Sequence, residues 1–266
     1  MFKTRLLSGI VLVILALVVI ITGGYVTLFS LLGISLIGMY ELYRVFKLEK
    51  TPLAYISYAM AVVFYISELF PGFIDQMALV MLFLILMMFV YVFSYPKYEA
   101  KDVMAIFFGM FYVAVMLSYV YQIRILESGV YLAFLIFICS WGCDTCAYCV
   151  GVLFGKHKMA PALSPKKSIE GAVGGVVGTA LLTVIYASIF RTQMGLETRG
   201  IIVLAVISAV AGLISMIGDL TASAIKRNYD IKDYGELIPG HGGIMDRFDS
   251  TMITAPIIYY LAVYFL

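Results

Sequence analysis

The charged residues of this 266-residue chain are distributed so that long segments carry no charge. Eight runs of at least 16 residues contain no Asp, Glu, Lys or Arg: 6–40, 51–67, 76–96, 103–123, 128–143, 171–190, 200–218 and 250–266. A helix needs ~20 apolar residues to cross the ~30 Å hydrocarbon core of a bilayer. The first run would be about 52 Å long as one helix, and Gly23-Gly24 offers a turn near its middle. We therefore divide this run and predict nine spans.

Composition excludes the water-soluble classes of protein. Hydrophobic residues make up 63% of the chain and charged residues 13%, whereas a soluble domain is roughly 45–50% apolar and about 25% charged. The polar surface is too small for a cytosolic enzyme, a secreted disulfide scaffold, a disordered protein or a nucleic-acid binder. Polarity does not alternate along the runs, which argues against transmembrane strands. The predicted fold class is all-α: a polytopic transmembrane bundle forming one domain over 1–266, with scaffold spans in 1–125 and catalytic spans and loops in 126–266.

The distribution of Lys and Arg predicts which end of each span faces the cytoplasm. With a cytoplasmic N-terminus, the inner segments contain 15 of the 18 basic residues, Lys3 and Arg5 among them, and the outer loops contain the other three. Basic residues are retained on the cytoplasmic side, so we expect the C-terminal Leu266 on the outer side. The inner loops 156–170 and 226–249 contain most of the polar residues. We therefore expect a working surface at the cytoplasmic face, and the compact length favours the bacterial cytoplasmic (inner) membrane.

Four carboxylates lie within or next to the predicted spans. Asp144 and Asp219 interrupt apolar segments, and Asp246 and Asp249 directly precede the ninth span. A carboxylate in the hydrocarbon region costs at least ~2.5–3.5 kcal/mol on insertion scales and normally marks a functional site. The four acids can converge just below the cytoplasmic surface, where all-oxygen ligands suit one or two Mg²⁺ or Mn²⁺ ions. The alternative is that Asp144 and Asp219 each pair with a Lys or Arg, or cap a broken helix.

A basic segment precedes the seventh span. Ser164 followed by Pro165 is a helix-start signal, and the free N–H groups at a helix start favour phosphate. Lys166 and Lys167 add positive charge there. The alternative is ordinary retention of basic residues on the inner side, together with attraction to anionic headgroups.

The segment 218–250 combines three kinds of residue. Gly240, Gly242 and Gly243 let the backbone approach a ligand closely. Acids suited to a cation lie on both sides of these glycines, and they are accompanied by basic side chains able to bind phosphate oxygens: Lys226, Arg227 and Arg247. This combination is typical of phosphoryl or nucleotidyl transfer. A transporter or channel has little use for all three together.

The same segment resembles a known family. From Ser223 to Asp249 the sequence is similar to the signature of the phosphatidate cytidylyltransferases, or CDP-diacylglycerol synthases, and matches every defined position of S-x-[hydrophobic]-K-R-x4-K-D-x-[small]-x2-[hydrophobic]-[PG]-x-H-G-G-[hydrophobic]-x-D-R-[hydrophobic]-D. Two upstream elements also resemble the family: Asp144-Thr145 with Ala147-Tyr148, and residues 164–168 with Glu170-Gly171. The resemblance covers approximately residues 140–250, and Cys146 departs from it without affecting a catalytic position. It implies Mg²⁺-dependent conversion of CTP and phosphatidic acid into CDP-diacylglycerol and pyrophosphate.

The resemblance and the chemistry of these residues together give a set of expected roles. We expect a phosphate oxygen of phosphatidate to attack the α-phosphorus of CTP in line, with cations binding the attacking and leaving oxygens. The expected residues are, for catalysis, Asp246, Asp219, Lys167, Lys226, Arg227 and His241; for substrate binding, Ser164, Lys166, Ser223, Lys232, Gly242, Gly243 and Arg247; and for the metal, Asp144, Asp219, Asp246 and Asp249. The expected partners are CTP, phosphatidic acid and the lipid bilayer, with no nucleic acid.

Two other functions stay open at this point. One is a CTP-dependent membrane enzyme that acts on another lipid, such as an isoprenoid-alcohol kinase or an archaeal-lipid cytidylyltransferase. The other is a cation transporter with Asp144 and Asp219 as a midplane site, for which the His-Gly-Gly loop has no use.

Several further features are expected to be structural. The four cysteines of the sixth span follow one helix and cannot by themselves surround an ion. Glu41 with Arg44, and Arg124 with Glu127, are expected to be local helix pairs of little energy. Four glycines of the seventh span let a neighbouring helix approach closely, within the protomer or across a homodimer: Gly171, Gly174, Gly175 and Gly178.

Overall fold

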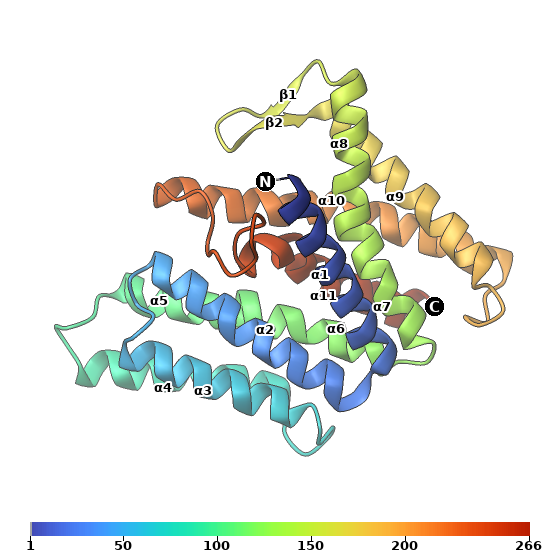
Figure 1. The fold of residues 1–266 in the computed structure, drawn as a ribbon. Helices are drawn as coiled ribbons and strands as arrows, with labels where there is room; N and C mark the ends of the chain where they lie inside the picture. The colour runs from blue at the N-terminus through green and yellow to red at the C-terminus, as the bar shows by residue number, and fades with distance from the viewer. Residues whose placement is uncertain (1) are drawn as a thin grey trace.

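The chain folds almost entirely into helices (Figure 1). The computed structural model describes residues 2–266, with side chains from residue 6 onward, so the side chains of Lys3 and Arg5 lie outside it. The elements are, in order, α1 (Phe2–Thr22), α2 (Gly24–Val45), α3 (Pro52–Ser67), α4 (Gln76–Phe93), α5 (Ala100–Gly109), η1 (Met110–Val115), α6 (Met116–Arg124), α7 (Gly129–Phe137), η2 (Ile138–Gly142), α8 (Cys143–Phe154), β1 (Lys158–Ala160), β2 (Ser164–Ser168), α9 (Ile169–Ile189), α10 (Thr198–Asn228) and α11 (Met245–Phe265). Over this described part they form nine continuous rods, because α5–η1–α6 and α7–η2–α8 each run on without a break.

Each rod covers one of the segments that the charge-free runs predict as a span. The division of the first run is confirmed, because α1 ends at Thr22 and φ is positive at Gly23 (71°) and Gly24 (50°). Among the described helices, six are long and apolar enough to cross a membrane, and α3 and the apolar part of α1 are shorter. The chain is therefore an all-α polytopic integral membrane protein. The number of rods that cross the bilayer, and their direction, stay predictions.

The turn between α1 and α2 is bound by a residue from the end of α6. Arg124 donates from Nε to the carbonyl oxygen of Ile20 (2.6 Å) and from Nη2 to that of Ile21 (3.2 Å). Its guanidinium lies where any side chain at Gly23 would collide with it. The expected local pair of Arg124 with Glu127 is therefore wrong, because the free carbonyl groups at the end of α1 bind the arginine.

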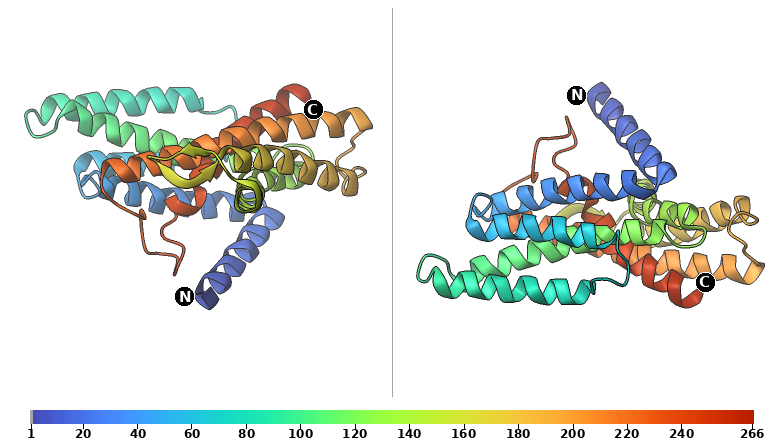
Figure 2. Two further views of the ribbon diagram at one scale, coloured as in Figure 1. Left: turned by 90° about the horizontal axis from the view of Figure 1, so that it is seen from above. Right: turned by 90° about the horizontal axis from the view of Figure 1, so that it is seen from below.

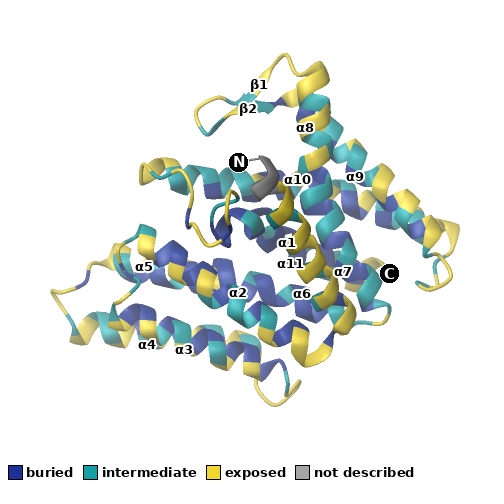
Figure 3. Ribbon diagram, in the orientation of Figure 1, coloured by how far each residue is buried: buried dark blue, intermediate teal, exposed yellow. Residues whose placement is uncertain are grey.

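The outer surface of the bundle is apolar. Large hydrophobic side chains are exposed along α1, α4 and α9 (Figure 3). A continuous apolar surface of this kind is stable only against lipid. Helix α1 is buried against the bundle at Ile20, close to its C-terminal end, and its N-terminal part projects from the side of the bundle (Figure 2).

Several polar side chains of α2 and α3 bind one another or the backbone inside the bundle. The Tyr43 hydroxyl lies 2.7 Å from Ser57 Oγ and 2.7 Å from the carbonyl oxygen of Ile106. Ser35 Oγ and the Tyr65 hydroxyl are 2.8 Å apart. Because hydrocarbon offers no hydrogen-bond partner, these contacts stabilise one arrangement of α2, α3 and α5.

The glycines of α9 pack against α8 and α10 of the same chain. A side-chain carbon at Gly178 would lie 2.6 Å from Cβ and Sγ of Cys146 on α8, and one at Gly175 would lie 2.7 Å from Met216 on α10. Cys146 and the other three cysteines of this rod are free thiols. Close helix packing within the protomer is thus confirmed, and the homodimer stays a prediction.

A short antiparallel hairpin, β1–β2, joins α8 to α9, where the sequence analysis predicts a helix start at Ser164-Pro165. Ser164 pairs with Ala160, and Ser168 pairs with Lys158. Helix α9 begins only at Ile169, and the Oγ of Ser168 accepts a hydrogen bond from the N–H of Gly171 (3.1 Å). The predicted start is wrong because Ser168 provides the same capping chemistry four residues later, while proline is tolerated on the edge of a two-stranded sheet.

Two π-helical segments, η1 and η2, interrupt the fifth and sixth rods. A π turn inserts an extra residue into a helix and is frequent at functional sites. In η2, Trp141 donates from Nε1 to the carbonyl oxygen of Arg247 (3.3 Å), which ties this segment to the start of α11.

Candidate functional site

A cavity of about 590 Å³ lies between the hairpin and helices α8, α9 and α10. Five residues identified from the sequence line it: Asp144 of α8, Asp219 of α10, and Ser164, Lys166 and Lys167 of β2. The hairpin therefore brings the basic loop against the two acids that interrupt the spans. Lysine and carboxylate groups share one water-accessible hollow at this end of the bundle.

A lysine partly neutralises the acids of this cavity. Lys167 forms an ion pair with Asp219, and the two side chains are 24% and 26% exposed. Asp144 is near enough to interact electrostatically with Asp219, Lys167 and Arg247. Asp219 thus pairs with a basic residue, as one of the open alternatives expects, and this pair lies on the cavity wall where a ligand can reach it.

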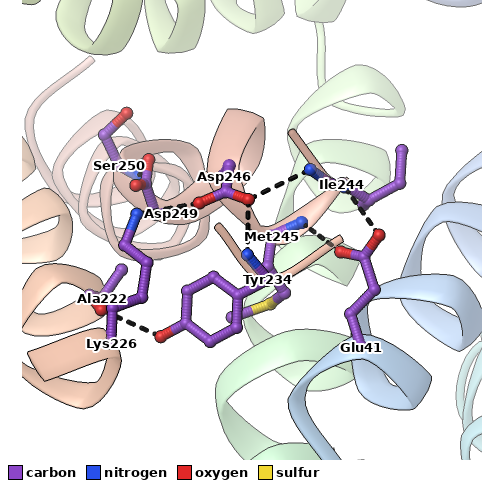
Figure 4. A network of polar contacts seen from close by, with 10 residues as sticks. Glu41, Ala222, Lys226, Tyr234, Ile244, Met245, Asp246, Asp249 and Ser250 are labelled. Carbon is purple, nitrogen blue, oxygen red and sulfur yellow. Dashed lines mark hydrogen bonds and ion pairs between the residues drawn. The ribbon is translucent and has the colours of Figure 1, made fainter. Parts of the chain in front are cut away.

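Asp246 lies at the start of α11 and orders the loop that precedes this helix. Its Oδ1 accepts a hydrogen bond from Lys226 Nζ (2.8 Å), and its Oδ2 accepts from the backbone N–H groups of Tyr234 (2.8 Å) and Gly243 (3.0 Å) (Figure 4). Gly242 has a φ of +85°, and a side-chain carbon there would lie 2.7 Å from Oδ2. Glycine is required where the loop passes the carboxylate, because any side chain would occupy the space of its oxygen.

Asp249 of α11 lies near acids that line the cavity and near the lysine that binds Asp246. Its buried carboxylate interacts electrostatically with Asp219, Lys226 and Asp144. Gly218 of α10 packs directly on α11, since a side-chain carbon at this position would lie 2.8 Å from the carbonyl oxygen of Asp249. The close approach of α10 and α11 therefore brings acids from α8, α10 and α11 together at one end of the bundle.

Two residues of α2 also bind the loop, although their sequence pattern predicts only a local helix pair. Glu41 accepts hydrogen bonds from the N–H groups of Ile244 (Oε1, 3.1 Å) and Met245 (Oε2, 2.9 Å). Arg44 donates from Nη2 to the carbonyl oxygen of Tyr234 (2.7 Å). Glu41 and Arg44 also interact electrostatically, as the expected local pair does, but their hydrogen bonds go to the backbone of the loop. One signal was available: Glu41 lies near the C-terminal end of its helix, where the helix dipole disfavours a negative charge, so it needs partners from elsewhere.

His241 lies in the same loop and contacts the N-terminal part of α1. Its Nδ1 is 2.8 Å from Ser8 Oγ, and this hydroxyl also donates to the carbonyl oxygen of Pro239 (3.0 Å). A side-chain carbon at Gly9 would lie 3.7 Å from Cε1 of the imidazole. The loop that precedes α11 projects on the same side of the bundle as α1 and contacts this helix there (Figure 2).

The other predicted site residues differ in their surroundings. Arg227 and Lys232 are exposed and Ser223 is half-buried; over the described residues, no ion pair joins Arg227 or Lys232 to a carboxylate. The Nε of Arg247 is buried and has no hydrogen-bond partner within the described protein, and the same is true of the Tyr112 hydroxyl in η1. Both groups lie near the acids, since Tyr112 interacts electrostatically with Asp249 and Asp219, and Arg247 with Asp144; each can still form a hydrogen bond.

The carboxylates can be tested as ligands of a divalent cation. They offer only oxygen donors, which Mg²⁺ prefers. Lys167 and Lys226 each contact one of the four predicted ligands. In the part of the chain that the structure describes, no three His, Cys, Asp or Glu side chains lie close enough together to chelate an ion. The donor chemistry therefore fits Mg²⁺, while the positions of the side chains are those of lysine-paired acids.

Comparison with known proteins identifies a family and several relatives. The sequence model of the Cytidylyltransferase family matches residues 3–265. A Bacillus subtilis (strain 168) protein named Phosphatidate cytidylyltransferase is 30% identical over 269 aligned residues, which cover 99% of this chain and 98% of that protein. A protein of the same name from Staphylococcus haemolyticus (strain JCSC1435) is 29% identical over 265 residues, with 98% and 99% covered. One from Thermotoga maritima is 32% identical over 164 residues, with 62% and 60% covered.

Proposed function

Because this chain belongs to the cytidylyltransferase family, we propose that the acids and lysines described above form the active site of a phosphatidate cytidylyltransferase. The enzyme is a nucleotidyltransferase that converts CTP and phosphatidate into CDP-diacylglycerol and pyrophosphate for phospholipid biosynthesis. One observation supports this site above all: Asp144, Asp219 and Asp249 converge from α8, α10 and α11 beside Lys167 and Lys226.

The reaction forms one phosphoanhydride bond and breaks another. A phosphate oxygen of phosphatidate attacks the α-phosphorus of CTP, the bond from this phosphorus to the bridging oxygen of the β-phosphate breaks, and pyrophosphate leaves with the electron pair. A phosphate monoester has its second pKa near ~6 and is largely ionised at pH 7, so no side chain has to remove a proton from it. The protein must therefore supply charge neutralisation and in-line positioning.

The basic side chains of the site are suited to bind phosphate oxygens. Lys167 and Lys226 are partly buried, at 24% and 15% exposed, so their charges act through less water than surface charges do. The unpartnered Nε of Arg247 is a further buried donor, and an arginine can bind two oxygens of one phosphate. Lys166 and Ser164 line the same cavity. We assign these groups to the triphosphate of CTP and the phosphate of the lipid.

Mg²⁺ is the proposed cofactor, with Mn²⁺ as a substitute. The residues that would hold it are Asp144, Asp219, Asp246 and Asp249, two of which are paired with lysines in this structure. When bound, such a cation neutralises phosphate charge and stabilises the leaving pyrophosphate.

We further propose that the site faces the cytoplasm at the bacterial inner membrane. The end of the bundle that bears the site is the end with the most Lys and Arg in its loops, and such loops stay on the cytoplasmic side. Similar proteins in Bacillus and Staphylococcus are bacterial. CTP would enter from water at the hairpin, and phosphatidate from the surrounding lipid.

The function can be tested with the purified full-length protein, phosphatidate, and CTP labelled at either the α- or the γ-phosphate. We expect the α-label in the lipid and the γ-label in pyrophosphate. Turnover should stop when EDTA removes divalent cations and return when Mg²⁺ is added. Transfer of the γ-label to the lipid would identify a lipid kinase and overturn the proposal.

Variants of the site test its position. Asp219→Asn and Lys226→Met are expected to lower kcat/KM by about 100-fold or more, because the first removes a proposed cation ligand and the second a positive charge that acts on the phosphates. The matched control is Asp230→Asn, an exposed residue just beyond α10 with a φ of 52°, a conformation that asparagine tolerates. Equal activity of Asp219→Asn and Asp230→Asn would show that the site lies elsewhere.

A further inference from the structure

A second cavity, of about 860 Å³, lies where α3 ends and α4 begins and reaches along α11 to Ile253, four residues after Asp249. It is a half-open hollow lined by the end of α3, the loop from α3 to α4, and parts of α4, η1, α6 and α11. The carboxylate site lies instead where α10 ends and α11 begins. The reaction proposed above makes no use of this cavity.

The wall of this cavity is apolar along its length and polar at one end. Its apolar part includes Phe111, Val115, Ile253 and Ile257. The polar end is formed by the α3–α4 connection and by two tyrosines whose hydroxyl oxygens are 2.7 Å apart: Glu68, Asp75, Gln76, Tyr119 and Tyr260. An apolar hollow with polar groups at one end fits an amphiphile, with its chain along the helices and its headgroup at the loop.

Glu68 is a buried acid without a basic partner. It is 8% exposed, and its Oε1 accepts a hydrogen bond from Nε2 of Gln122 (2.9 Å), which also donates to Oε1 of Gln76 (3.1 Å). No Lys or Arg is found among the described residues that line the cavity. Burial raises the pKa of Glu68, which favours its neutral form. The polar end presents acidic, amide and phenol groups and no positive charge; its amide and phenol groups can both donate and accept hydrogen bonds.

Charge complementarity decides which amphiphile fits. A phosphate headgroup would lie near the carboxylate of Asp75, and the described lining contains no Lys or Arg to compensate its charge, which is unfavourable. An uncharged hydroxyl can donate to a carboxyl or amide oxygen and accept from an amide N–H or a phenol O–H. Hydroxyl-bearing headgroups therefore satisfy the site, and anionic ones do not.

We propose that this cavity binds a glyceride with a free hydroxyl, a diacylglycerol or monoacylglycerol, with the hydroxyl at Glu68 and Gln76 and an acyl chain between α4, α6 and α11. It is a lipid site separate from the active site, and it does not depend on the proposed function.

The test uses the full-length protein in phosphatidylcholine nanodiscs and a diacylglycerol with a photoreactive diazirine on one acyl chain. We expect cross-links on the cavity-lining residues of α4, α6 and α11, mapped by peptide mass spectrometry. Unlabelled diacylglycerol should compete for labelling ~10-fold better than phosphatidate or phosphatidylethanolamine, because the site offers no counter-charge to a phosphate. Equal competition by the three lipids would mean that the cavity takes bulk lipid, and would overturn the proposal.

Variants separate the cavity from the lipid-facing surface. Ile257→Trp fills the cavity and should abolish labelling, whereas Val92→Trp, on the exposed face of α4, should leave labelling unchanged. Glu68→Gln keeps a neutral hydrogen-bonding group and should retain diacylglycerol, and Glu68→Lys should make phosphatidate the better competitor. Turnover of CTP by each variant checks that it is folded. Unchanged labelling of Ile257→Trp would contradict the lipid site. A wild-type protein that is labelled as expected but does not turn over CTP would refute only the proposed function.

Discussion

The carboxylate of Glu41 connects two segments that are more than 200 residues apart in the chain. It binds the N–H groups of Ile244 and Met245, and Asp246 and Asp249 follow directly on the same helix. A buried donor that loses its acceptor costs about 1–3 kcal/mol. We therefore expect Glu41→Ala to lower the melting temperature in detergent and to reduce CTP turnover strongly, because the start of α11 loses its fixed position.

The controls for Glu41 are a conservative variant and a distant acid. Glu41→Gln keeps one carbonyl acceptor and should lie between wild type and Glu41→Ala in both measurements. Glu127→Ala removes an exposed acid and should change neither. A Glu41→Ala protein as stable and active as Glu127→Ala would show that these hydrogen bonds do not position the helix.

An acid of the site could be predicted from the sequence only where its neighbours in the sequence reveal it. Asp144 and Asp219 could be identified because a charge in an apolar segment is costly wherever the chain folds. The contacts of Glu41 could not, because its partners are backbone amides of a distant loop. The two N–H groups that bind Asp246 likewise depend on the shape of that loop, which the positive φ at Gly242 makes possible but does not specify.

At the scale of elements, the α8–α9 contact depends on glycine. A side-chain carbon at Gly178 would lie 2.6 Å from Cys146, so Gly178→Val would force the helices apart. Overpacking of this kind costs about 1–3 kcal/mol, and it would also move the hairpin that connects the two helices. We expect a lower melting temperature and a higher KM for CTP. Gly33→Ala, at a helical glycine with nothing within 4 Å of an added carbon, should have neither effect.

The contact between α1 and the His-Gly-Gly loop predicts that the effects of Ser8 and His241 on turnover are coupled. If Ser8 acts on the reaction by positioning His241, to which it lies within 2.8 Å, the single and double alanine variants should not be additive. We expect Ser8→Ala to lower kcat several-fold in wild type and to have little further effect in His241→Ala, as contacting residues normally show. Independent effects on kcat in a double-mutant cycle would contradict this role for α1.

The helices could be predicted from the sequence, whereas the hairpin and the two π-helical segments could not. Charge-free runs identify apolar rods because the bilayer imposes length and polarity on each one. The hairpin escaped prediction because its strands are only three and five residues long, and because Ser164 and Ser168 both fit a helix start. The π turns η1 and η2 escaped it because they arise from packing between rods, for which the sequence has no periodic signal.

At the scale of the whole molecule, the distribution of Lys and Arg predicts the orientation. In right-side-out vesicles, Thr192→Cys in the α9–α10 loop should react at once with a membrane-impermeant maleimide. Lys232→Cys in the α10–α11 loop should react only after permeabilisation. Unmodified protein measures the background from its own thiols. The reverse pattern would place the carboxylate site on the outer side and would refute the predicted topology.

The lysines of the site have a consequence for how ligands bind. Lys167 and Lys226 are already paired with Asp219 and Asp246, so a polyphosphate that attracts both ammonium groups leaves two acids without counter-charge in partly buried surroundings, which is costly. Any cation that restores positive charge to these acids must then strengthen polyphosphate binding, and by thermodynamic reciprocity the polyphosphate strengthens cation binding by the same factor. For the proposed Mg²⁺ and CTP, we therefore predict that each binds more tightly in the presence of the other.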